Sequence, residues 1–538
     1  MRIRPGWLQA LTRVGYPLLL FILALGLYGY TLAPTITWQH DGYDAGDLIV
    51  AAHTLGIPHP TGYPTYMLLG KAFTCLPLGD VAYRMNLMSA VCAALGTVLL
   101  YLSARTLLQP LSSASALPLE QRYASLASWC AAGLFATSRV FWSQAVITEV
   151  YALNCLFFAL LLFLLLQLPR HLATQPLSAS GCRRAWRSLA LSGWLLGLSL
   201  GNHLTTMFTL PLVLFHARLT ARHCGWRPTQ WLRVLATVAL GLSVYLYLPL
   251  RAGRQPLLNW GNPSNWRGFL WLVTGGIYRQ YVLALPLVYW PERVLAWAIL
   301  LRQQFGLWGT ALGLFGAWQH ARRRPQQFGV LALTFAIYSA YAIGYNTTDS
   351  YVYLLPAYFV YALWIAQGAF CLLQMLNGVP GWRRQMVLLL SLVLLALPLA
   401  SLLTNLPLVD LSEDYTAYDY GMQVLQQVPD GSLVVSATDA HSFTLWYFAR
   451  VVAGRDQLAL LDRDLLGYDW YVAGLRQCYP WLELPGDRAG TVSLERLLEA
   501  NAGAHPIFFT DPDAGLMARY RLQEQGRLYR LQTAAPSP

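Results

Sequence analysis

The stretch WQHDGYDAGDLIVAAHTLGIPHPTGYPTY, from Trp38 to Tyr66, follows the first long apolar segment of the chain. It places carboxylates and histidines directly beside a segment that is long enough to span a bilayer, namely Asp41, Asp44, Asp47, His40, His53 and His59. Acidic side chains are costly at membrane depth, so their presence there needs a reason. We therefore expect this stretch to carry the functional residues, and the rest of the chain to be organised around it.

The composition indicates an integral membrane protein. The chain has 538 residues, of which 56% are hydrophobic and 12% are charged, whereas a soluble domain carries roughly 25% charged residues. The net charge of +12 could suggest a nucleic-acid partner, but lysine is nearly absent and the arginines lie in short blocks between apolar runs. This distribution is typical of topology signals, so we expect membrane lipids and no nucleic acid as partners.

The apolar runs predict a polytopic α-helical membrane protein with about eleven transmembrane helices, because one span needs about 20 apolar residues. The predicted spans lie at 14–33, 81–104, 123–138, 150–168, 187–202, 203–217, 232–250, 294–318, 327–345, 351–375 and 386–404. Asn202-His203 interrupts the fifth and sixth, where either a turn or a kink would fit. The first run, with Arg2, Arg4 and Arg13 before it, is expected to be an uncleaved signal anchor.

Arginines support this topology because they recur in every second loop, as the positive-inside rule requires when the N-terminus is cytoplasmic. The inner loops contain Arg105 and Arg122; Arg170, Arg183, Arg184 and Arg187; Arg218, Arg222, Arg227 and Arg233; Arg322, Arg323 and Arg324; and Arg383 and Arg384. The outward loops of a membrane domain at residues 1–404 then include 34–80, 138–149 and 251–293. The glycine, proline and asparagine punctuation and the amphipathic pieces of the last loop suggest interfacial helices or re-entrant backbone that lines a cavity.

Residues 405–538 predict a small extracytoplasmic α/β domain. A buried strand is expected within 431–437, a helix over 441–452, a second strand at 458–461 and a third at 506–510. No glycine-rich phosphate fingerprint follows these strands, so nucleotide binding is unsupported. Among the eight cysteines, only Cys75 and Cys478 would face outwards. A disulfide between them is an alternative to the buried or free thiols that we expect.

Asp44 and Asp47 are three residues apart and would share one face of a helix. A capping box, with Asp44 at the N-cap and Asp47 at N3, explains the same spacing and is compatible with catalysis. Glu149 lies in the next outward loop, where it is either a helix cap or a second catalytic or metal-binding acid. Asp349, in the turn 346–349, is a weaker candidate.

Several further residues are expected to bind substrate from the same side of the membrane. His59 and Tyr63 lie in a turn stiffened by Pro60 and Pro64, which could also be only a connector. Asn202 and His203 lie at the outer end of two spans, where a histidine is as often structural as functional. Arginines in an outward loop run against the topology rule and would fit a lipid-linked phosphate or, alternatively, lipid head groups. These are Arg251, Arg254, Arg267 and Arg279, with Trp260 and Tyr278 beside them in the loop.

Taken in order, the motifs of this chain resemble a bacterial family of GT-C-type membrane glycosyltransferases that is related to the protein O-mannosyltransferases of the endoplasmic reticulum. The resemblance is carried by DAGDLIVAAHTLGIPHPTGYPTYMLLG (44–70), RMNLMSA (84–90), FWSQAVITEVYALN (141–154), GLSLGNHL (197–204), LPLRAG (248–253), NWGNP (259–263) and YNTTDSYVYLLP (345–356). The family pattern usually has Glu where this chain has Asp47 and Pro where it has Thr61. The shorter acid puts in doubt any role that needs the reach of glutamate.

The resemblance implies a GT-C-like fold in a bacterial inner membrane, with a periplasmic C-terminal domain and an outer-face active site. It also implies inverting transfer of a sugar, mannose being one candidate, from a polyprenyl-phosphate donor to a protein, lipid or glycan acceptor. In that hypothesis Asp44 is the base, while Asp47 and Glu149 orient the acceptor or hold a divalent cation such as Mg²⁺ or Mn²⁺. Arg251 and Arg279 receive the departing phosphate, assisted by His59 or His203. The alternatives are a flippase for lipid-linked saccharides and an inactive scaffold.

Overall fold

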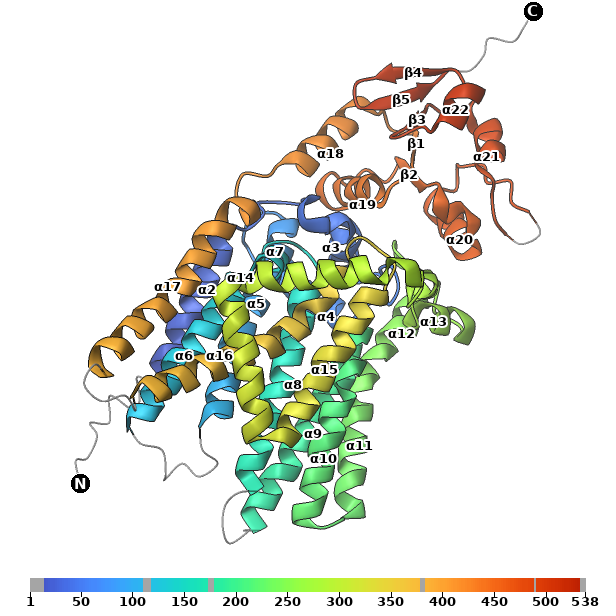
Figure 1. Ribbon diagram of the computed structural model, residues 1–538. Coiled ribbons are helices and arrows are strands. Elements are labelled where there is room, and N and C mark those ends of the chain that lie inside the picture. The colour runs from blue at the N-terminus through green and yellow to red at the C-terminus, as the bar shows by residue number, and fades with distance from the viewer. Residues whose placement is uncertain (1–13, 110–117, 173–178, 378–382, 488–489, 533–538) are drawn as a thin grey trace, which may run out of the picture.

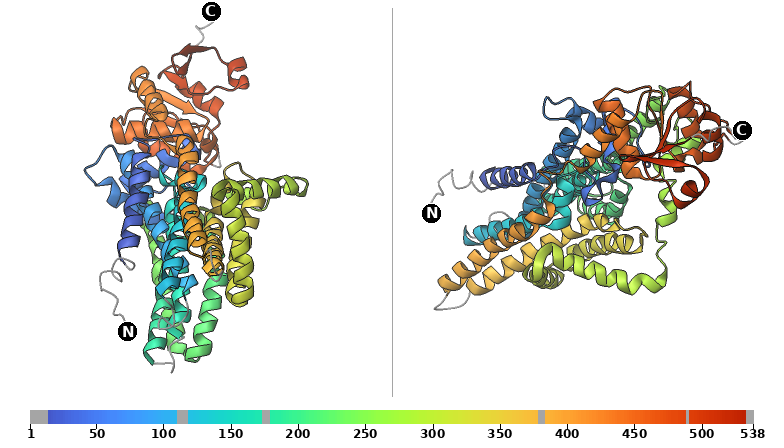
Figure 2. Two further views of the ribbon diagram at one scale, coloured as in Figure 1. Left: turned by 60° about the vertical axis from the view of Figure 1, so that its left-hand side comes forward. Right: turned by 90° about the horizontal axis from the view of Figure 1, so that it is seen from above.

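The computed structural model describes residues 14–109, 118–172, 179–377, 383–487 and 490–532. A bundle of long helices forms the lower part of the molecule, and the C-terminal domain stands above one end of it (Figures 1 and 2). Helices of the first outward loop lie between these two parts, so the functional stretch identified from the sequence is at the junction. The N-terminal arginines Arg2, Arg4 and Arg13 lie outside the described residues.

Each predicted span coincides with a helix of the bundle. The helices are α2 (Tyr16–Tyr30), α5 (Val81–Leu108), α6 (Pro118–Ala136), α8 (Tyr151–Leu172), α9 (Ala179–Leu200), α10 (Leu210–Cys224), α11 (Pro228–Leu242), α14 (Trp290–Arg323), α15 (Pro325–Gly344), α16 (Leu355–Asn377) and α17 (Arg383–Val409). Within the described residues, seven helical segments are long and apolar enough to cross a membrane. Leu388, Leu389 and Leu392 of α17 are each more than half exposed, as expected for a face that contacts lipid.

The span predicted at 294–318 is not one straight helix. Gly306 interrupts α14 with φ 65°, a left-handed backbone conformation that glycine adopts at no steric cost. The first half of α14 therefore runs across the outer side of the bundle, and the second half runs along it (Figure 1). A hydropathy window cannot detect such a change of direction, because both halves are apolar.

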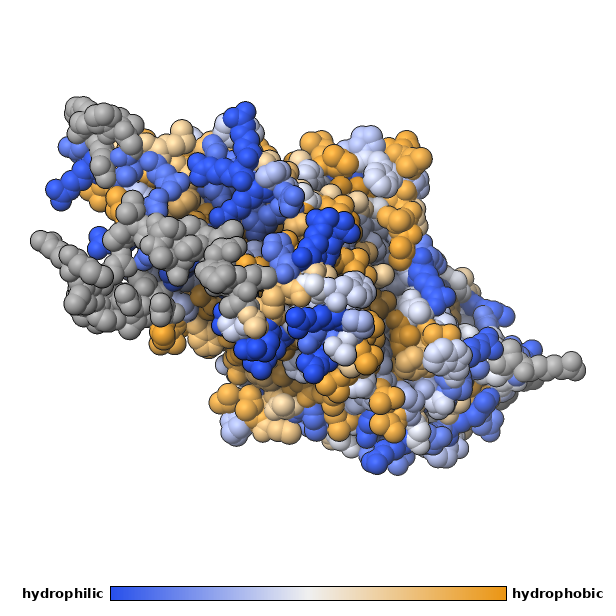
Figure 3. All heavy atoms as spheres, turned by 90° about the horizontal axis from the view of Figure 1, so that it is seen from below, coloured by the Kyte–Doolittle hydropathy of each residue, from blue (hydrophilic) through white to orange (hydrophobic). Residues whose placement is uncertain are grey.

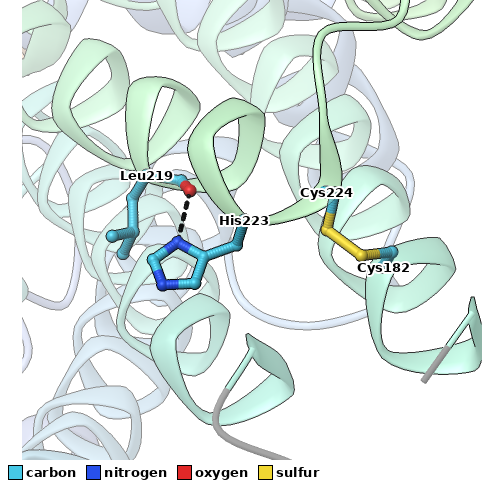
Figure 4. The surroundings of a disulfide bond; sticks show 4 residues. All are labelled: Cys182, Leu219, His223 and Cys224. Atoms are coloured by element: carbon cyan, nitrogen blue, oxygen red, sulfur yellow. Dashed lines mark hydrogen bonds between the residues drawn. A yellow bond between two sulfur atoms is a disulfide. The ribbon is translucent and has the colours of Figure 1, made fainter. Parts of the chain in front are cut away.

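Asn202-His203 forms a turn between antiparallel helices. Cys182 at the start of α9 and Cys224 at the end of α10 form a disulfide (Figure 4), so these two helix ends are adjacent and the chain reverses at residues 202–203. This pairing was not predicted, whereas Cys75 and Cys478 are both free. The same end of the bundle carries exposed arginines, and Figure 3 shows hydrophilic residues grouped there among apolar ones.

Short elements cluster at the opposite end of the bundle, next to the C-terminal domain (Figure 1). They comprise η2 (Gln39–Asp44), α3 (Ala45–Thr54), α4 (Pro64–Thr74), α7 (Arg139–Ala145), η3 (Leu204–Thr209), η4 (Ser243–Leu246), α12 (Tyr247–Ala252), α13 (Trp266–Val273), η5 (Tyr278–Tyr281), η6 (Leu287–Tyr289) and η7 (Ser350–Leu354). Loop 251–293, predicted to form interfacial helices or re-entrant backbone, contributes several of them. These short elements and the loops next to them contain the predicted site residues.

The C-terminal domain contains a five-stranded mixed sheet in the order β2-β1-β3-β5-β4. The three predicted strands are present as β1 (Leu433–Ser436), β2 (Ala459–Asp462) and β3 (Ile507–Phe509), with β1 parallel to both neighbours. A hairpin of β4 (Leu522–Gln525) and β5 (Leu528–Leu531) was not predicted; its outer strand is largely exposed. The helices are α18 (Thr416–Gln427), α19 (Asp439–Tyr447), the π-helical turn η8 (Phe448–Val452), η9 (Asp464–Gly467), α20 (Asp469–Cys478), α21 (Leu494–Asn501) and α22 (Ala514–Arg519).

Candidate active site

Helix α19 of the C-terminal domain packs directly on α3, and Gly46 makes this contact possible. A Cβ atom at position 46 would lie 2.0 Å from the carbonyl oxygen of Phe443, so any larger residue would push the two helices apart. Trp38 secures the contact by donating its Nε1–H to the carbonyl oxygen of Ala440 at 3.1 Å and to Thr444 Oγ1 at 2.9 Å. The glycine between the two aspartates therefore serves the docking of the second domain.

Asp44 stands at the N-cap position of α3 but makes no side-chain capping hydrogen bond. The alternative of a capping box is therefore wrong for this residue. Its side chain is 36% exposed, and its Oδ2 lies 3.5 Å from His59 Nε2. Burial raises the pKa of the Asp44 carboxyl above its ordinary value, and His59 opposes this shift. Asp44 is thus a partly exposed carboxylate of increased basicity.

Asp47 is fully buried and uses both of its oxygens to hold other residues. Its Oδ2 accepts hydrogen bonds from the backbone N–H of His59 at 2.9 Å and from His59 Nδ1 at 2.8 Å. Its Oδ1 accepts from Trp260 Nε1 at 3.0 Å. The loop that carries Trp260 is fixed next to His59 because the backbone of Ile57 exchanges hydrogen bonds with Leu258 and Trp260. Asp47 is therefore a positioning residue for His59 and Trp260.

His59 links the two aspartates, since Nδ1 contacts Asp47 and Nε2 faces Asp44. Burial alone would lower the pKa of His59, but Asp44 and Asp47 outweigh it and raise the pKa to about 9. The imidazole is therefore cationic at neutral pH. The rings of Tyr63, Trp260 and Tyr278 surround it edge-on, with centroids 5.0, 6.3 and 6.2 Å away, and fix its orientation.

Three further carboxylates, those of Glu149, Asp349 and Asp439, lie close to Asp44 and His59. Glu149 is buried, and its pKa is raised well above the ordinary value by burial and then by the charge of Asp44. Asp349, the weaker candidate from the sequence, is close enough for its charge to raise the pKa of both. Asp439 enters from α19, where burial and then Asp44 raise its pKa to about 7. Such crowding of acids around one imidazolium is typical of functional sites.

The predicted arginines do not hydrogen-bond to the acidic residues around His59. Arg251 donates from Nε to the carbonyl oxygen of Leu55 at 2.5 Å and from Nη2 to that of Thr54 at 3.2 Å, so it caps the end of α3 opposite to Asp44. Arg279 is exposed and hydrogen-bonds to Thr274, although it follows Tyr278 in the chain. Arg254 and Arg267 are exposed. The expectation that Arg251 faces the acidic residues is therefore wrong.

The other predicted residues play supporting parts in the structure. His203 Nδ1 accepts from the Thr205 N–H as the cap of η3, and burial lowers its pKa to about 4, so it is neutral. Asn202 donates to the carbonyl oxygen of Val150 at 3.2 Å, beside Glu149. Tyr63 donates its hydroxyl to the carbonyl oxygen of Pro60 at 3.0 Å. Each of them fixes backbone close to an acidic residue.

The three acids predicted as metal ligands, Asp44, Asp47 and Glu149, do not fit a prearranged metal site. Asp47 already accepts three hydrogen bonds through its two oxygens. In the part of the chain that the structure describes, no group of three or more His, Cys, Asp or Glu side chains has the arrangement of a metal centre. No step of the chemistry below is therefore assigned to a metal ion.

Asp439 was not predicted as a site residue, because it lies more than 370 residues after Tyr66, the end of the functional stretch. A signal was available, because Asp439 follows the carboxyl end of the buried strand β1, where α/β proteins place functional residues. Also not predicted was Arg293 of α14, which donates to the carbonyl oxygen of Thr347 at 2.9 Å and so holds the turn that carries Asp349.

Comparison with known proteins shows a similarity to protein O-mannosyl-transferases. The family model described as "Protein O-mannosyl-transferase TMEM260 N-terminal domain" matches residues 44–223, which include Asp44, His59 and Glu149. The mouse protein O-mannosyl-transferase TMEM260 is 25% identical over 466 residues, covering 83% of this chain. Its counterpart in Dictyostelium discoideum is 23% identical over 546 residues, covering 91%. In both comparisons the chain spans 63% of the relative's length.

Two solved structures share the fold. ArnT from Cupriavidus metallidurans, in a crystal structure with undecaprenyl phosphate bound, superposes with a TM-score of 0.59 at 12% identity, covering 96% of this chain and 98% of ArnT. The Archaeoglobus fulgidus oligosaccharyltransferase, tethered to an acceptor peptide, superposes with a TM-score of 0.51 at 12% identity, covering 93% and 69%. The predicted GT-C-like fold, with its small C-terminal sheet domain, is confirmed.

Proposed function

We propose that this chain is a membrane glycosyltransferase that moves a sugar from a polyprenyl-phosphate donor to an acceptor hydroxyl, with inversion at the anomeric carbon. The observation that carries the proposal is Asp44, a carboxylate free of capping bonds that is 36% exposed and lies 3.5 Å from His59. The similarity of the chain to protein O-mannosyl-transferases favours mannose as the sugar. The undecaprenyl phosphate bound to ArnT favours a polyprenyl-linked donor.

In the proposed reaction, the acceptor oxygen attacks the anomeric carbon while Asp44 takes the proton of the hydroxyl. A bond forms between that oxygen and the anomeric carbon, and the bond from the same carbon to the phosphate oxygen breaks. The electron pair leaves with the polyprenyl phosphate. General-base assistance of this kind contributes about 10²–10⁴-fold to the rate, and the raised pKa of Asp44 makes its carboxylate the stronger base.

The residues around Asp44 have distinct parts in this proposal. His59, held by Asp47, faces the Asp44 carboxylate and fixes its orientation. Burial and the charge of Asp44 raise the pKa of Glu149 well above its ordinary value, which favours the protonated form that donates a hydrogen bond to the acceptor. Tyr278, whose ring lies beside His59, and Arg279, the next residue in the chain, are the remaining candidates from loop 251–293 for contacting the departing phosphate.

The proposed setting is a bacterial inner membrane with the site on the periplasmic side. The inner-loop arginines and the acidic site lie at opposite ends of the bundle, which agrees with the positive-inside rule. The arrangement of the described polar residues at one end of the bundle also favours an enzyme over a flippase, since flippase and transporter sites typically lie near the middle of the membrane.

The test is Asp44→Asn in the full chain, reconstituted in nanodiscs with polyprenyl-phosphate mannose and peptide or glycan acceptors. We expect transfer to fall by about 10²-fold or more while the thermal stability stays close to that of the parent. Asp419→Asn, in an exposed turn of α18, is the matched control and should transfer normally. Full transfer by a correctly inserted Asp44→Asn protein would refute the proposed base, and movement of donor lipid without cleavage of the sugar bond would favour a flippase.

A further inference from the structure

A cavity lies between loop 255–262 of the membrane domain and helix α20 of the C-terminal domain. It holds about 930 Å³ of empty space, counted out to the solvent at its opening. Its walls are rich in aromatic rings and carboxamides, namely Trp260, Trp446, Trp470, Tyr471 and Tyr479 together with Gln255, Asn259, Asn262 and Gln477. Neither the predicted base nor its acidic neighbours line it.

Trp260 is the wall that this cavity shares with the candidate active site. Its Nε1 donates to Asp47, while its ring packs against that of Trp470 with centroids 5.3 Å apart. The same ring lies 6.3 Å from that of His59. A molecule bound in the cavity is therefore separated from the Asp47–His59 pair by the thickness of one side chain.

Two buried polar atoms at this cavity have no hydrogen-bond partner among the described residues. They are the acceptor Asn259 Oδ1 and the donor Trp470 Nε1. Both atoms lie buried in the side chains of the cavity wall. A hydroxyl group that reaches them donates to the first and accepts from the second, whereas an apolar occupant leaves both unsatisfied. Asn259 is held in place by donating from Nδ2 to Asn262 Oδ1 at 3.3 Å. The lining thus favours an occupant that carries hydroxyl groups.

The cavity is also electrically neutral. Among the residues that the structure describes, Arg450 is the one charged residue in its lining. The Nη1 atom of Arg450 lies 2.8 Å from Asp456, and its Nη2 contacts the hydroxyl of Tyr479. With this charge already compensated, the site offers no free cation to a phosphate and no carboxylate to an amine. Charged ligands are therefore disfavoured.

From these observations we infer that the cavity binds a neutral sugar unit. Flat aromatic walls suit the apolar faces of a pyranose ring, and carboxamide groups suit its hydroxyls. Building on the proposed function, we assign this unit to the acceptor, so that the chain extends or decorates a glycan whose preceding sugar lies behind Trp260. The sugar of the donor has the same chemistry, and the experiment below separates the two sources.

The test is isothermal titration of the full chain in nanodiscs with mannotriose, cellotriose and maltotriose. We expect at least one trisaccharide to bind, and we expect Trp470→Ala and Asn259→Leu each to weaken that binding by about tenfold or more. Trp266→Ala removes a 71% exposed tryptophan of loop 251–293 that does not line the cavity. This variant should bind as the parent does. Polyprenyl-phosphate mannose should bind without competing with the trisaccharide.

Three outcomes would overturn the inference: no trisaccharide binds, binding is unchanged in both cavity variants, or an aromatic peptide binds there in preference to sugars. Displacement of the trisaccharide by polyprenyl-phosphate mannose would assign the cavity to the donor and overturn the acceptor assignment. Asp44→Asn should keep trisaccharide binding while it loses transfer. Loss of transfer in Asp44→Asn without any sugar binding would leave the proposed function standing and remove only this inference.

Discussion

The two ends of α3 have opposite electrostatic character, although the same short helix joins them. At its N-terminal end, Asp44 and Asp47 face one imidazolium and further carboxylates from other loops. At its C-terminal end, Arg251 binds the last carbonyl oxygens. Both placements agree with the helix dipole, which favours anions at the N-terminus and cations at the C-terminus. The helix has ten residues and so separates the two ends by about 15 Å.

This difference shows why an arginine in a functional loop need not be a functional arginine. The sequence predicts that Arg251 and Asp44 lie on the same side of the membrane. In the structure, α12 and α3, which carry or flank them, lie at the same end of the helix bundle. Only the packing of α12 against the end of α3 determines that Arg251 stabilises the scaffold. The chemistry can therefore be altered at one end of α3 with little effect at the other, and each of the following substitutions tests that separation.

Gly46→Ala should have the largest effect, because it acts on the end of α3 that carries the acids. The new Cβ would lie 2.0 Å from the Phe443 carbonyl oxygen, and contacts under 3.0 Å are essentially never observed, so α19 must move by about 1 Å. A displacement of that size at an active site can cost about 10²-fold in rate. We expect transfer to fall accordingly and the C-terminal domain to become more sensitive to protease. Gly329→Ala, a helical glycine with open space around it, is the control and should behave as the parent.

Asp47→Asn should have an intermediate effect that depends on pH. Asp47 is one of the groups that raise the pKa of His59 to about 9 against the effect of burial, so without its charge this pKa falls. The alkaline limb of the rate profile should therefore move to lower pH, and transfer at pH 8 should fall by about tenfold or more. The profile of kcat/KM between pH 5 and pH 10 measures this, and an unchanged alkaline limb would show that His59 does not control it.

The same pKa shift fixes the sign of the pH dependence of stability in the parent. The pKa of His59 is higher in the folded chain than its ordinary value of 6.5. Its contribution is therefore complete below about pH 6.5 and is lost as the pH rises through about 9. Thermal inactivation of the parent should accelerate over that interval, and Asp47→Asn should lack this acceleration.

Arg251→Met should have the smallest effect on transfer. It removes the hydrogen bonds at the C-terminal end of α3, so we expect a loss of about 1–2 kcal/mol in stability. The KM for polyprenyl-phosphate mannose should stay within about twofold of the parent value, because the guanidinium does not face Asp44. A tenfold increase in that KM would restore Arg251 as a phosphate ligand. Arg254→Met, at an exposed position, provides the matched control.

The sequence predicted those parts of the site that depend on local spacing and on topology. Asp44, Asp47, His59 and Tyr63 lie within one loop, and the alternation of arginines placed Glu149 on the same side of the membrane. It could not predict which end of α3 each arginine would meet, because that depends on tertiary packing. Asp439 was missed for the same reason, since it reaches the site only through the docking of α19 on Gly46. The break in α14 at Gly306 was missed because hydropathy does not report direction.

The disulfide between Cys182 and Cys224 joins the start of α9 to the end of α10. These helix ends lie at the end of the bundle opposite to α3 (Figure 1). In sealed vesicles, a reductant that cannot cross the bilayer would reach this sulfur pair from one compartment, while a water-soluble acceptor would reach the carboxylates only from the other. The chain thus carries its own marker of sidedness, with which the orientation of every inserted molecule can be counted without adding a tag.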